Sequence, residues 1–210
     1  MSDTAQSAPQ DTEPKPKLKP AFWAIILIMG IVLGFVLRTW VVGIYSIPSG
    51  SMEPTLHGSE NHGDQILVNK AVYEFSSPSN GDIIVFNAER WADDDSTYIK
   101  RVIAGPGQTV GVNSKGEVTV DGRALTEPYL SDDESRFEPG VLDCDTSPQS
   151  QKCFPDVTLG EDEYWVMGDN RAHSADSTYG CRGKQDPDEC RGPVTADEIQ
   201  GRYMFTLPWF

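Results

Sequence analysis

An apolar segment close to the N-terminus constrains this chain more than any other part of its sequence. Residues 21–37 read AFWAIILIMGIVLGFVL, without a charged side chain, and after Arg38 the residues TWVVG continue the segment to position 43. A bilayer span needs about 20 apolar residues in an α-helix. A cleavable secretory signal is the alternative, but its apolar region is shorter and typically ends at an A-x-A site, which is missing here. We therefore expect residues 21–43 to form a retained transmembrane anchor.

Charge on either side of this segment predicts its orientation. Three lysines precede it within residues 15–19, whereas no Lys or Arg occurs at positions 39–69. Because cytoplasmic flanks carry the excess of basic residues, we expect the N-terminus in the cytoplasm. Residues 1–20 are rich in Pro, Gln, Ser and charge, which is typical of a disordered tail. The sequence thus predicts a single-pass plasma-membrane protein, in contact with membrane lipid, whose residues 44–210 lie on the extracytoplasmic face.

The cysteines fit an oxidising compartment. All four follow the apolar segment, in two C-x8-C pairs: Cys144 with Cys153, and Cys181 with Cys190. Three connectivities are possible, and local pairing is the simplest. Each closed loop would then stabilise the fold by roughly 2–3 kcal/mol. A zinc site is the alternative, but C-x2-C spacing and nearby histidines are missing.

Residues 44–210 are expected to form a mostly β domain. Short apolar or alternating runs are separated by Gly, Pro, Asn and Asp, and none keeps helical spacing over more than ten positions. The strand-like runs are QILVNKAVYEF (65–75), GDIIVFNAER (81–90), TYIKRVIAGPG (97–107), TVGV (109–112), EVTVDG (117–122), EYWVMGDN (163–170) and RYMFTLPWF (202–210). Antiparallel sheets suit such a pattern.

Two further features of the composition bear on this domain. Residues 131–160 are acidic, contain proline and carry the first cysteine pair, which predicts a surface excursion from the β domain, itself β-rich and closed by its disulfide. The formal net charge of −15 argues against a nucleic-acid partner.

Ser51, in IPSGSMEPTL (47–56), is a candidate nucleophile. A serine hydroxyl needs an adjacent base and donors for the oxyanion, and the common G-x-S-x-G elbow does not surround Ser51. His57 and His62 lie in a connection rich in Gly, Asn and Asp, where a solvated loop histidine is the ordinary interpretation. The sequence therefore gives little support to a Ser/His/Asp enzyme, and the stretch by itself also fits a turn.

A lysine can act as the base if its amine is neutral. Its reference pKa of about 10.4 must then fall by two to three units, at a cost of roughly 3–4 kcal/mol, and burial can supply that much. Two lysines lie in apolar strand-like runs, Lys70 in ILVNKAVYEF and Lys100 in TYIKRVI. Either can also be a solvated strand residue, and periodicity does not choose between them. The polar residues 168–180, GDNRAHSADSTYG, fit either a tight turn or the support of a catalytic site.

Taken together, these segments resemble bacterial signal peptidase I, the leader peptidase family. The resemblance covers nearly everything from the apolar segment to the C-terminus. It rests on IPSGSMEPTL (47–56), GDIIVF (81–86), YIKRVIAGPGQ (98–108), GDNRAHSADSTYG (168–180) and a closing GRYMFTLPW (201–209). It implies a membrane-bound serine endopeptidase with a Ser/Lys dyad on an antiparallel β fold, which needs no metal or organic cofactor. Its substrates would be the signal peptides of preproteins, cleaved after small residues at −1 and −3, and the protein export machinery would be its partner.

The resemblance also implies roles by position. Ser51 would be the nucleophile and Lys100 the general base, which leaves Lys70 structural or exposed. Ser49 would contribute its hydroxyl to the oxyanion hole, and Ser174 would hydrogen-bond the Lys100 amine. Supporting ion pairs and hydrogen bonds would come from Asp169, Asp176 and Arg101. Apolar pockets for the substrate would draw on Tyr45, Ile47, Met52, Leu56, Tyr98 and Ile99.

Two positions depart from the family pattern. His173 stands where Asn is common, and Thr178 stands where Arg is common, so that Asp176 has no ion pair to position 178. The resemblance does not explain the connection at 57–64 or the excursion at 131–160. Two other functions stay open: a non-catalytic, membrane-anchored β module that binds a partner, and a self-cleaving Ser/Lys protease like the SOS repressors. The anchor and the cysteine pairs argue against the second.

Overall fold

The computed structural model describes residues 20–87, 89–91, 96–130, 143–147 and 149–208. The chain divides into two compact units, Met1–Leu37 and Arg38–Phe210. Of the predicted tail, residues 1–20, only Pro20 lies within the described ranges. The first twelve residues of the excursion, 131–142, also lie outside them.

The apolar segment forms a helix that ends earlier than predicted. The α-helix α1 (Pro20–Val36) is followed directly by the π-helix η1 (Leu37–Val41). Across the described ranges, no helix is long and apolar enough to cross a membrane. Val42 and Gly43, which we had placed in the anchor, instead begin the strand β1 (Val42–Ser46), because their backbone pairs with β2 (Gln65–Asn69) in the second unit.

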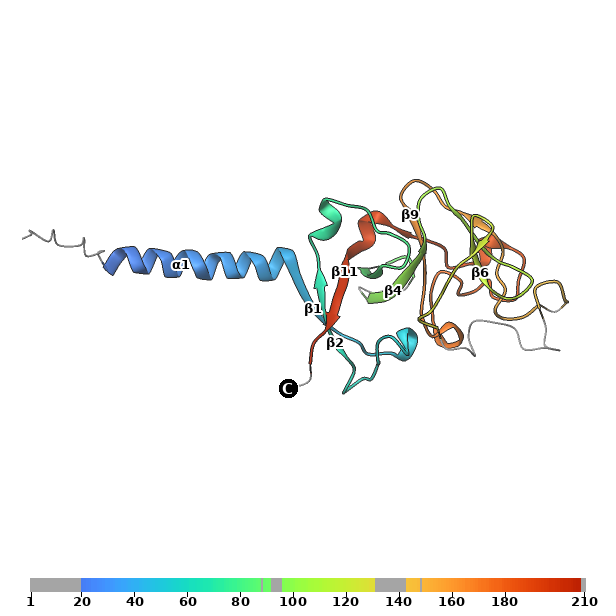
Figure 1. Ribbon diagram of the computed structural model, residues 1–210, viewed down its shortest axis with the longest axis horizontal. Coiled ribbons are helices and arrows are strands. Elements are labelled where there is room, and N and C mark those ends of the chain that lie inside the picture. The colour runs from blue at the N-terminus through green and yellow to red at the C-terminus, as the bar shows by residue number, and fades with distance from the viewer. Residues whose placement is uncertain (1–19, 88, 92–95, 131–142, 148, 209–210) are drawn as a thin grey trace, which may run out of the picture. The chain divides into compact units, whose positions relative to one another are not determined.

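The second unit contains two antiparallel sheets (Figure 1). The order of the seven-stranded sheet is β1, β2, β11 (Ile199–Thr206), β3 (Ile83–Asn87), β4 (Thr97–Ala104), β9 (Glu163–Met167) and β10 (Val194–Thr195). The order of the four-stranded sheet is β7 (Arg123–Ala124), β6 (Val118–Val120), β5 (Thr109–Val112) and β8 (Val157–Thr158). The prediction of a mostly β, antiparallel domain is confirmed.

Strand β4 lies inside the larger sheet and decides the position of the chemistry. It pairs with β3 on one side and β9 on the other. Its six residues from Ile99 to Ala104 are all buried, so the alternation of buried and exposed side chains that marks a half-covered strand is absent. Lys100 and Arg101 are therefore both enclosed by protein, and such charges must find partners.

Both cysteine pairs form local disulfides. Cys144 is bonded to Cys153 and Cys181 to Cys190, each over a sequence separation of nine. All four cysteines are used in this way, so a cysteine zinc site is excluded. Cys153 and Cys181 are buried, and Cys181 belongs to the core cluster that contains Trp165 and Met167 of β9. The second disulfide thus ties a connecting loop to the core beneath the larger sheet.

Candidate active site

Ser51 and Lys100 meet although 49 positions separate them. Ser51 lies in the 3-10 turn η2 (Gly50–Met52), and Lys100 lies on β4. The Lys100 Nζ donates to Ser51 Oγ at 2.8 Å and to the carbonyl oxygen of Ile99 at 2.8 Å. Only 8% of Ser51 and 3% of Lys100 are exposed. The pair therefore sits where water cannot readily solvate an ammonium ion.

This burial changes the acidity of the amine. It lowers the pKa of Lys100 to about 8, since the charged form loses its hydration. The Asp176 and Asp169 carboxylates act in the opposite direction and raise this pKa, whereas the Arg191 guanidinium lowers it. Lysine at position 100 thus meets the requirement for a base, because a substantial part of it is neutral at moderately alkaline pH.

The loop after β9 holds the Ser51 turn in place. The backbone N–H of Asn170 donates to the Ser51 carbonyl at 3.1 Å, and the Asn170 side-chain amide donates to the Gly50 carbonyl at 3.1 Å. Gly168 leaves no room for a side chain, because a Cβ there would lie 2.3 Å from both the Ser51 carbonyl oxygen and Ser174 Oγ. A glycine at this position is what lets the loop pack so closely on the Ser51 turn.

Ser49 contacts the Ser51–Lys100 pair through a hydrogen bond, whereas Ser174 makes none with it. The Ser49 hydroxyl donates to Ser51 Oγ at 3.4 Å, which places it beside the candidate nucleophile. Ser174 is buried, yet its hydroxyl has no hydrogen-bond partner in the described part of the chain. The predicted bond from Ser174 to the Lys100 amine is not formed; the two bonds of that amine go to Ser51 and the Ile99 carbonyl.

Arg101 and Asp169 form a buried ion pair next to the Lys100 strand position. Nε and Nη2 of Arg101 donate to the two carboxylate oxygens of Asp169 at 2.8 and 2.5 Å, and Thr55 Oγ1 adds a bond of 2.5 Å. The same guanidinium donates to the Gly81 carbonyl and lies 3.9 Å above the centre of the Tyr129 ring. Sequence reasoning anticipated the ion pair but missed Thr55 and Tyr129.

Asp176 does have an ion pair, and it comes from a residue that sequence reasoning missed. Arg182 Nη2 lies 3.1 Å from each Asp176 carboxylate oxygen. Thr178 donates its N–H and its hydroxyl to the same carboxylate, and the Gly168 N–H is a further donor. Arg182 therefore supplies the guanidinium that position 178 lacks. Its only sequence signal was its place beside Cys181, at the start of a cysteine pair.

The six candidate pocket residues do not all come together. Five of them lie in or against one apolar cluster, with Met52 and Leu56 fully buried at its centre. These five are Tyr45, Ile47, Met52, Leu56 and Ile99. Tyr98 packs elsewhere, stacked on Phe86 and edge-on to Trp91. The structure thus separates Tyr98 from the others.

The remaining candidates make no described contact with the Ser51–Lys100 pair. Lys70 directly follows β2 and borders a hollow formed by Gly43, Tyr45 and their neighbours. His57, His62 and His173 are exposed. Within the described residues, no cluster of three or more His, Cys, Asp or Glu side chains could hold a metal ion.

Comparison with known proteins identifies the family of this chain. The family model described as signal peptidase, peptidase S26, matches residues 20–209. Signal peptidase I of Mycobacterium tuberculosis (strain ATCC 25618 / H37Rv) is 36% identical, across 96% of this chain and 77% of that protein. Signal peptidase I S of Bacillus subtilis (strain 168) is 33% identical, across 75% and 78%. A crystal structure of a signal peptidase I from Enterococcus faecalis V583 is 25% identical, with a TM-score of 0.41 over 60% of this chain and 97% of that chain. The chain therefore belongs to the signal peptidase family, peptidase S26, whose members are serine endopeptidases.

Proposed function

We propose that this protein cleaves signal peptides from exported preproteins, with Ser51 as the nucleophile and Lys100 as the general base. The observation that carries the proposal is the 2.8 Å contact between Lys100 Nζ and Ser51 Oγ inside the protein. Family membership supports the substrate, and the pKa of about 8 for Lys100 supports the role of base. The reaction would proceed in two halves, acylation of Ser51 and hydrolysis of the resulting ester.

The first half-reaction acylates the serine. Neutral Lys100 takes the Ser51 proton as Oγ attacks the carbonyl carbon of the substrate residue at −1. The tetrahedral intermediate collapses when Lys100 gives that proton to the leaving amine. The C–N bond breaks, the mature protein departs, and the signal peptide stays bound to Ser51 as an ester.

The second half-reaction returns the enzyme to its starting state. Water replaces the amine, gives a proton to Lys100 and attacks the ester carbonyl. The proton passes back to Ser51 Oγ as the ester bond breaks, and the signal peptide leaves with a new carboxylate. In both halves the Ser49 hydroxyl, 3.4 Å from Ser51 Oγ, and the Ser51 backbone N–H would stabilise the oxyanion.

The apolar cluster beneath Ser51 would set the preference for small residues. Tyr45, Ile47, Met52, Leu56 and Ile99 gather in this cluster, and they would form shallow pockets for positions −1 and −3. A larger side chain would clash with them, and a smaller one would lose contacts. Ser174, Asp169, Asp176 and Arg101 would support the dyad.

Residues 21–41 would hold the protein at the membrane. α1 exposes its large apolar side chains, which supports contact with lipid. We infer from the basic residues before it that the N-terminus is cytoplasmic, so that the peptidase domain faces outward.

Cleavage of a preprotein by the full-length protein in detergent tests the proposal. A substrate with an A-x-A site should be cut after that site, and Ser51→Ala and Lys100→Ala should each reduce kcat by about 10³-fold or more. Wild-type rates in either variant would refute the dyad. No cleavage by the wild type would favour a non-catalytic binding module, and cleavage confined to the enzyme's own chain would favour a self-processing protease.

A further inference from the structure

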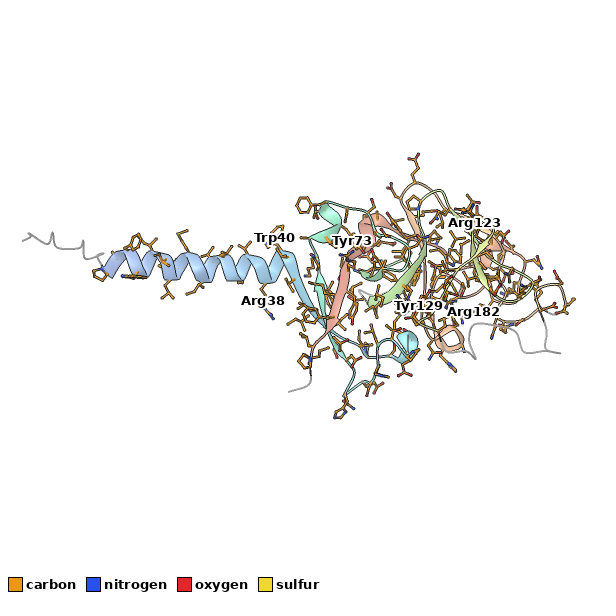
Figure 2. The ribbon with its side chains drawn as sticks, in the orientation of Figure 1. Arg38, Trp40, Tyr73, Arg123, Tyr129 and Arg182 are labelled. Carbon is orange, nitrogen blue, oxygen red and sulfur yellow. A yellow bond between two sulfur atoms is a disulfide. The ribbon has the colours of Figure 1, made fainter. Side chains whose placement is uncertain are left out.

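The loop closed by Cys181 and Cys190 carries an arginine directly after each cysteine. Arg191 lies over the rings of Tyr179 and Trp91, at 4.5 and 5.2 Å from their centres. Arg182, labelled in Figure 2, extends from the other end of the disulfide toward the loop that follows β9. Neither arginine has a part in the half-reactions above.

Arg182 contacts four residues of that loop through one guanidinium group. Nε donates to Thr178 Oγ1 at 2.7 Å, and Nη1 donates to the Arg171 carbonyl at 2.8 Å. Nη2 donates to the Ser174 carbonyl at 2.9 Å and to both oxygens of the Asp176 carboxylate. All three guanidinium nitrogens are therefore engaged, each with a different direction of bonding.

These contacts lead to the nucleophile by a short route. Asp176 Oδ2 accepts from the N–H of Gly168, the residue that packs against the Ser51 carbonyl without room for a Cβ. Two residues on, the Asn170 N–H donates to that same carbonyl. A change in the position of Asp176 is therefore passed to the backbone of Ser51 through one hydrogen bond and one close packing contact.

We propose that Arg182 is a positioning residue, which holds Asp176 and the Ser174 backbone from the Cys181–Cys190 loop and so keeps Ser51 in place for Lys100. The inference rests on the proposed Ser/Lys mechanism. The disulfide fixes the residue before Arg182 to the core, since Cys181 is fully buried. A guanidinium is required, because its three nitrogens lie apart in one plane and reach acceptors that the single nitrogen of a lysine ammonium cannot reach together.

Arg182 also sets the charge next to the Lys100 amine. The charged groups that act on Lys100 are Asp176, Asp169 and Arg191, with Arg101 adjacent on β4. While Arg182 neutralises Asp176, the field of that carboxylate at Lys100 is reduced. Without Arg182 the pKa of Lys100 should rise, and the rate should need a higher pH.

The test measures kcat and KM for preprotein cleavage as functions of pH, with full-length wild type and variants. Arg182→Gln should lower kcat by roughly tenfold or more and change KM by less than about twofold, because the chemistry rather than binding is displaced. The rising limb of its pH profile should move to higher pH. Arg182→Lys should recover less than half of the lost rate.

A double-mutant cycle decides whether Arg182 acts through Asp176. The combined variant Arg182→Gln/Asp176→Asn should be no slower than the slower single variant, since both remove the same link. Arg90→Gln is the matched control: Arg90 also makes a two-bonded ion pair, with Glu198, and bonds one backbone carbonyl. It should keep the wild-type rate.

Three results would overturn the proposal while leaving the Ser/Lys mechanism intact. The first is a wild-type kcat in Arg182→Gln. The second is a loss of kcat in the double variant that equals the product of the losses in the two single variants. The third is a wild-type kcat in Arg182→Lys beside a reduced kcat in Arg182→Gln. Thermal unfolding is measured alongside. If Arg182→Gln does not fold, Arg182→Lys carries the test: a kcat below about half of the wild-type value at unchanged KM is expected, and a wild-type kcat would contradict the proposal. If Ser51→Ala retains activity instead, the proposed function itself fails.

Discussion

Two buried carboxylates flank the candidate dyad, and their partners come from different kinds of structure. Asp169 and Asp176 are both fully buried, and each accepts from a guanidinium and a threonine hydroxyl. Asp169 is paired with Arg101, whose side chain is 10% exposed, on a strand bonded on both sides. Asp176 is paired with Arg182, whose side chain is 18% exposed, on a disulfide loop.

The two ion pairs differ in their expected effects on stability and on the pKa of Lys100. The Arg101–Asp169 pair is part of the sheet, so breaking it leaves a charge that cannot reach water. The Arg182–Asp176 pair lies nearer the surface, so its stability role is smaller. Yet Asp176 acts more strongly than Asp169 on the pKa of Lys100. We therefore expect Asp169 to matter more for stability and Asp176 more for acid–base chemistry.

The largest expected effect is on stability. Asp169→Asn leaves the buried Arg101 cation without its counterion and should reduce the free energy of unfolding by about 3–5 kcal/mol. Asp176→Asn should cost only about 1–3 kcal/mol, because Arg182 can be partly hydrated. Denaturant unfolding of both variants measures the difference. Equal losses, or a greater loss for Asp176→Asn, would remove the distinction between the two pairs.

The next effect is on the pH dependence of cleavage. In the wild type, kcat/KM should rise with pH through the pKa of Lys100, about 8, since the neutral amine is the active form. Both carboxylates raise this pKa by favouring the ammonium ion, so replacing either with Asn lowers it and moves the rising limb to lower pH. The move should be greater for Asp176→Asn. A profile that stays flat from about pH 5 to 9 would contradict the role of Lys100.

The smallest expected effect concerns Lys70, the other lysine of an apolar run. Its side chain is half-buried and borders a hollow with Gly43 and Tyr45, and no described contact joins it to Ser51. Lys70→Met should therefore leave kcat within about twofold of the wild type at every pH. A shift of the rising limb in Lys70→Met would show that Lys70 carries part of the base function that we assign to Lys100.

Local sequence patterns predicted the position of most strands, but they did not predict which strands pair with each other. The runs around residues 65–69, 83–87, 97–104, 109–112 and 163–167 all became strands, because apolar and β-branched residues bounded by turn residues favour extended backbone. The helical part of the apolar segment ends before Val42 and Gly43, two residues that fit a strand or an apolar helix equally well. Only pairing with β2 decides between them.

For the candidate site too, the sequence named residues but did not show which of them come into contact. The resemblance to the family was enough to name Ser51, Lys100, Arg101, Asp169 and Asp176 as candidates, because the motifs that carry it are read directly from the chain. The packing of Tyr98 apart from the other five pocket candidates was not foreseen, and Arg182 was missed, since both depend on which side of a fold a residue faces. No periodicity in the sequence carries that information.

The sequence by itself determined an apolar helix before a mostly β, antiparallel domain, two C-x8-C spacings and the family. These follow from composition, alternation and motif order, which are properties of neighbouring residues. The tertiary structure decided that Lys100 is the lysine buried against Ser51. It also decided that the ion pair of Asp176 is made by Arg182, from a disulfide loop. The physical reason is that desolvation and ion pairing depend on contacts between distant residues, and burial on both faces of β4 is set by the sheets and loops packed around it.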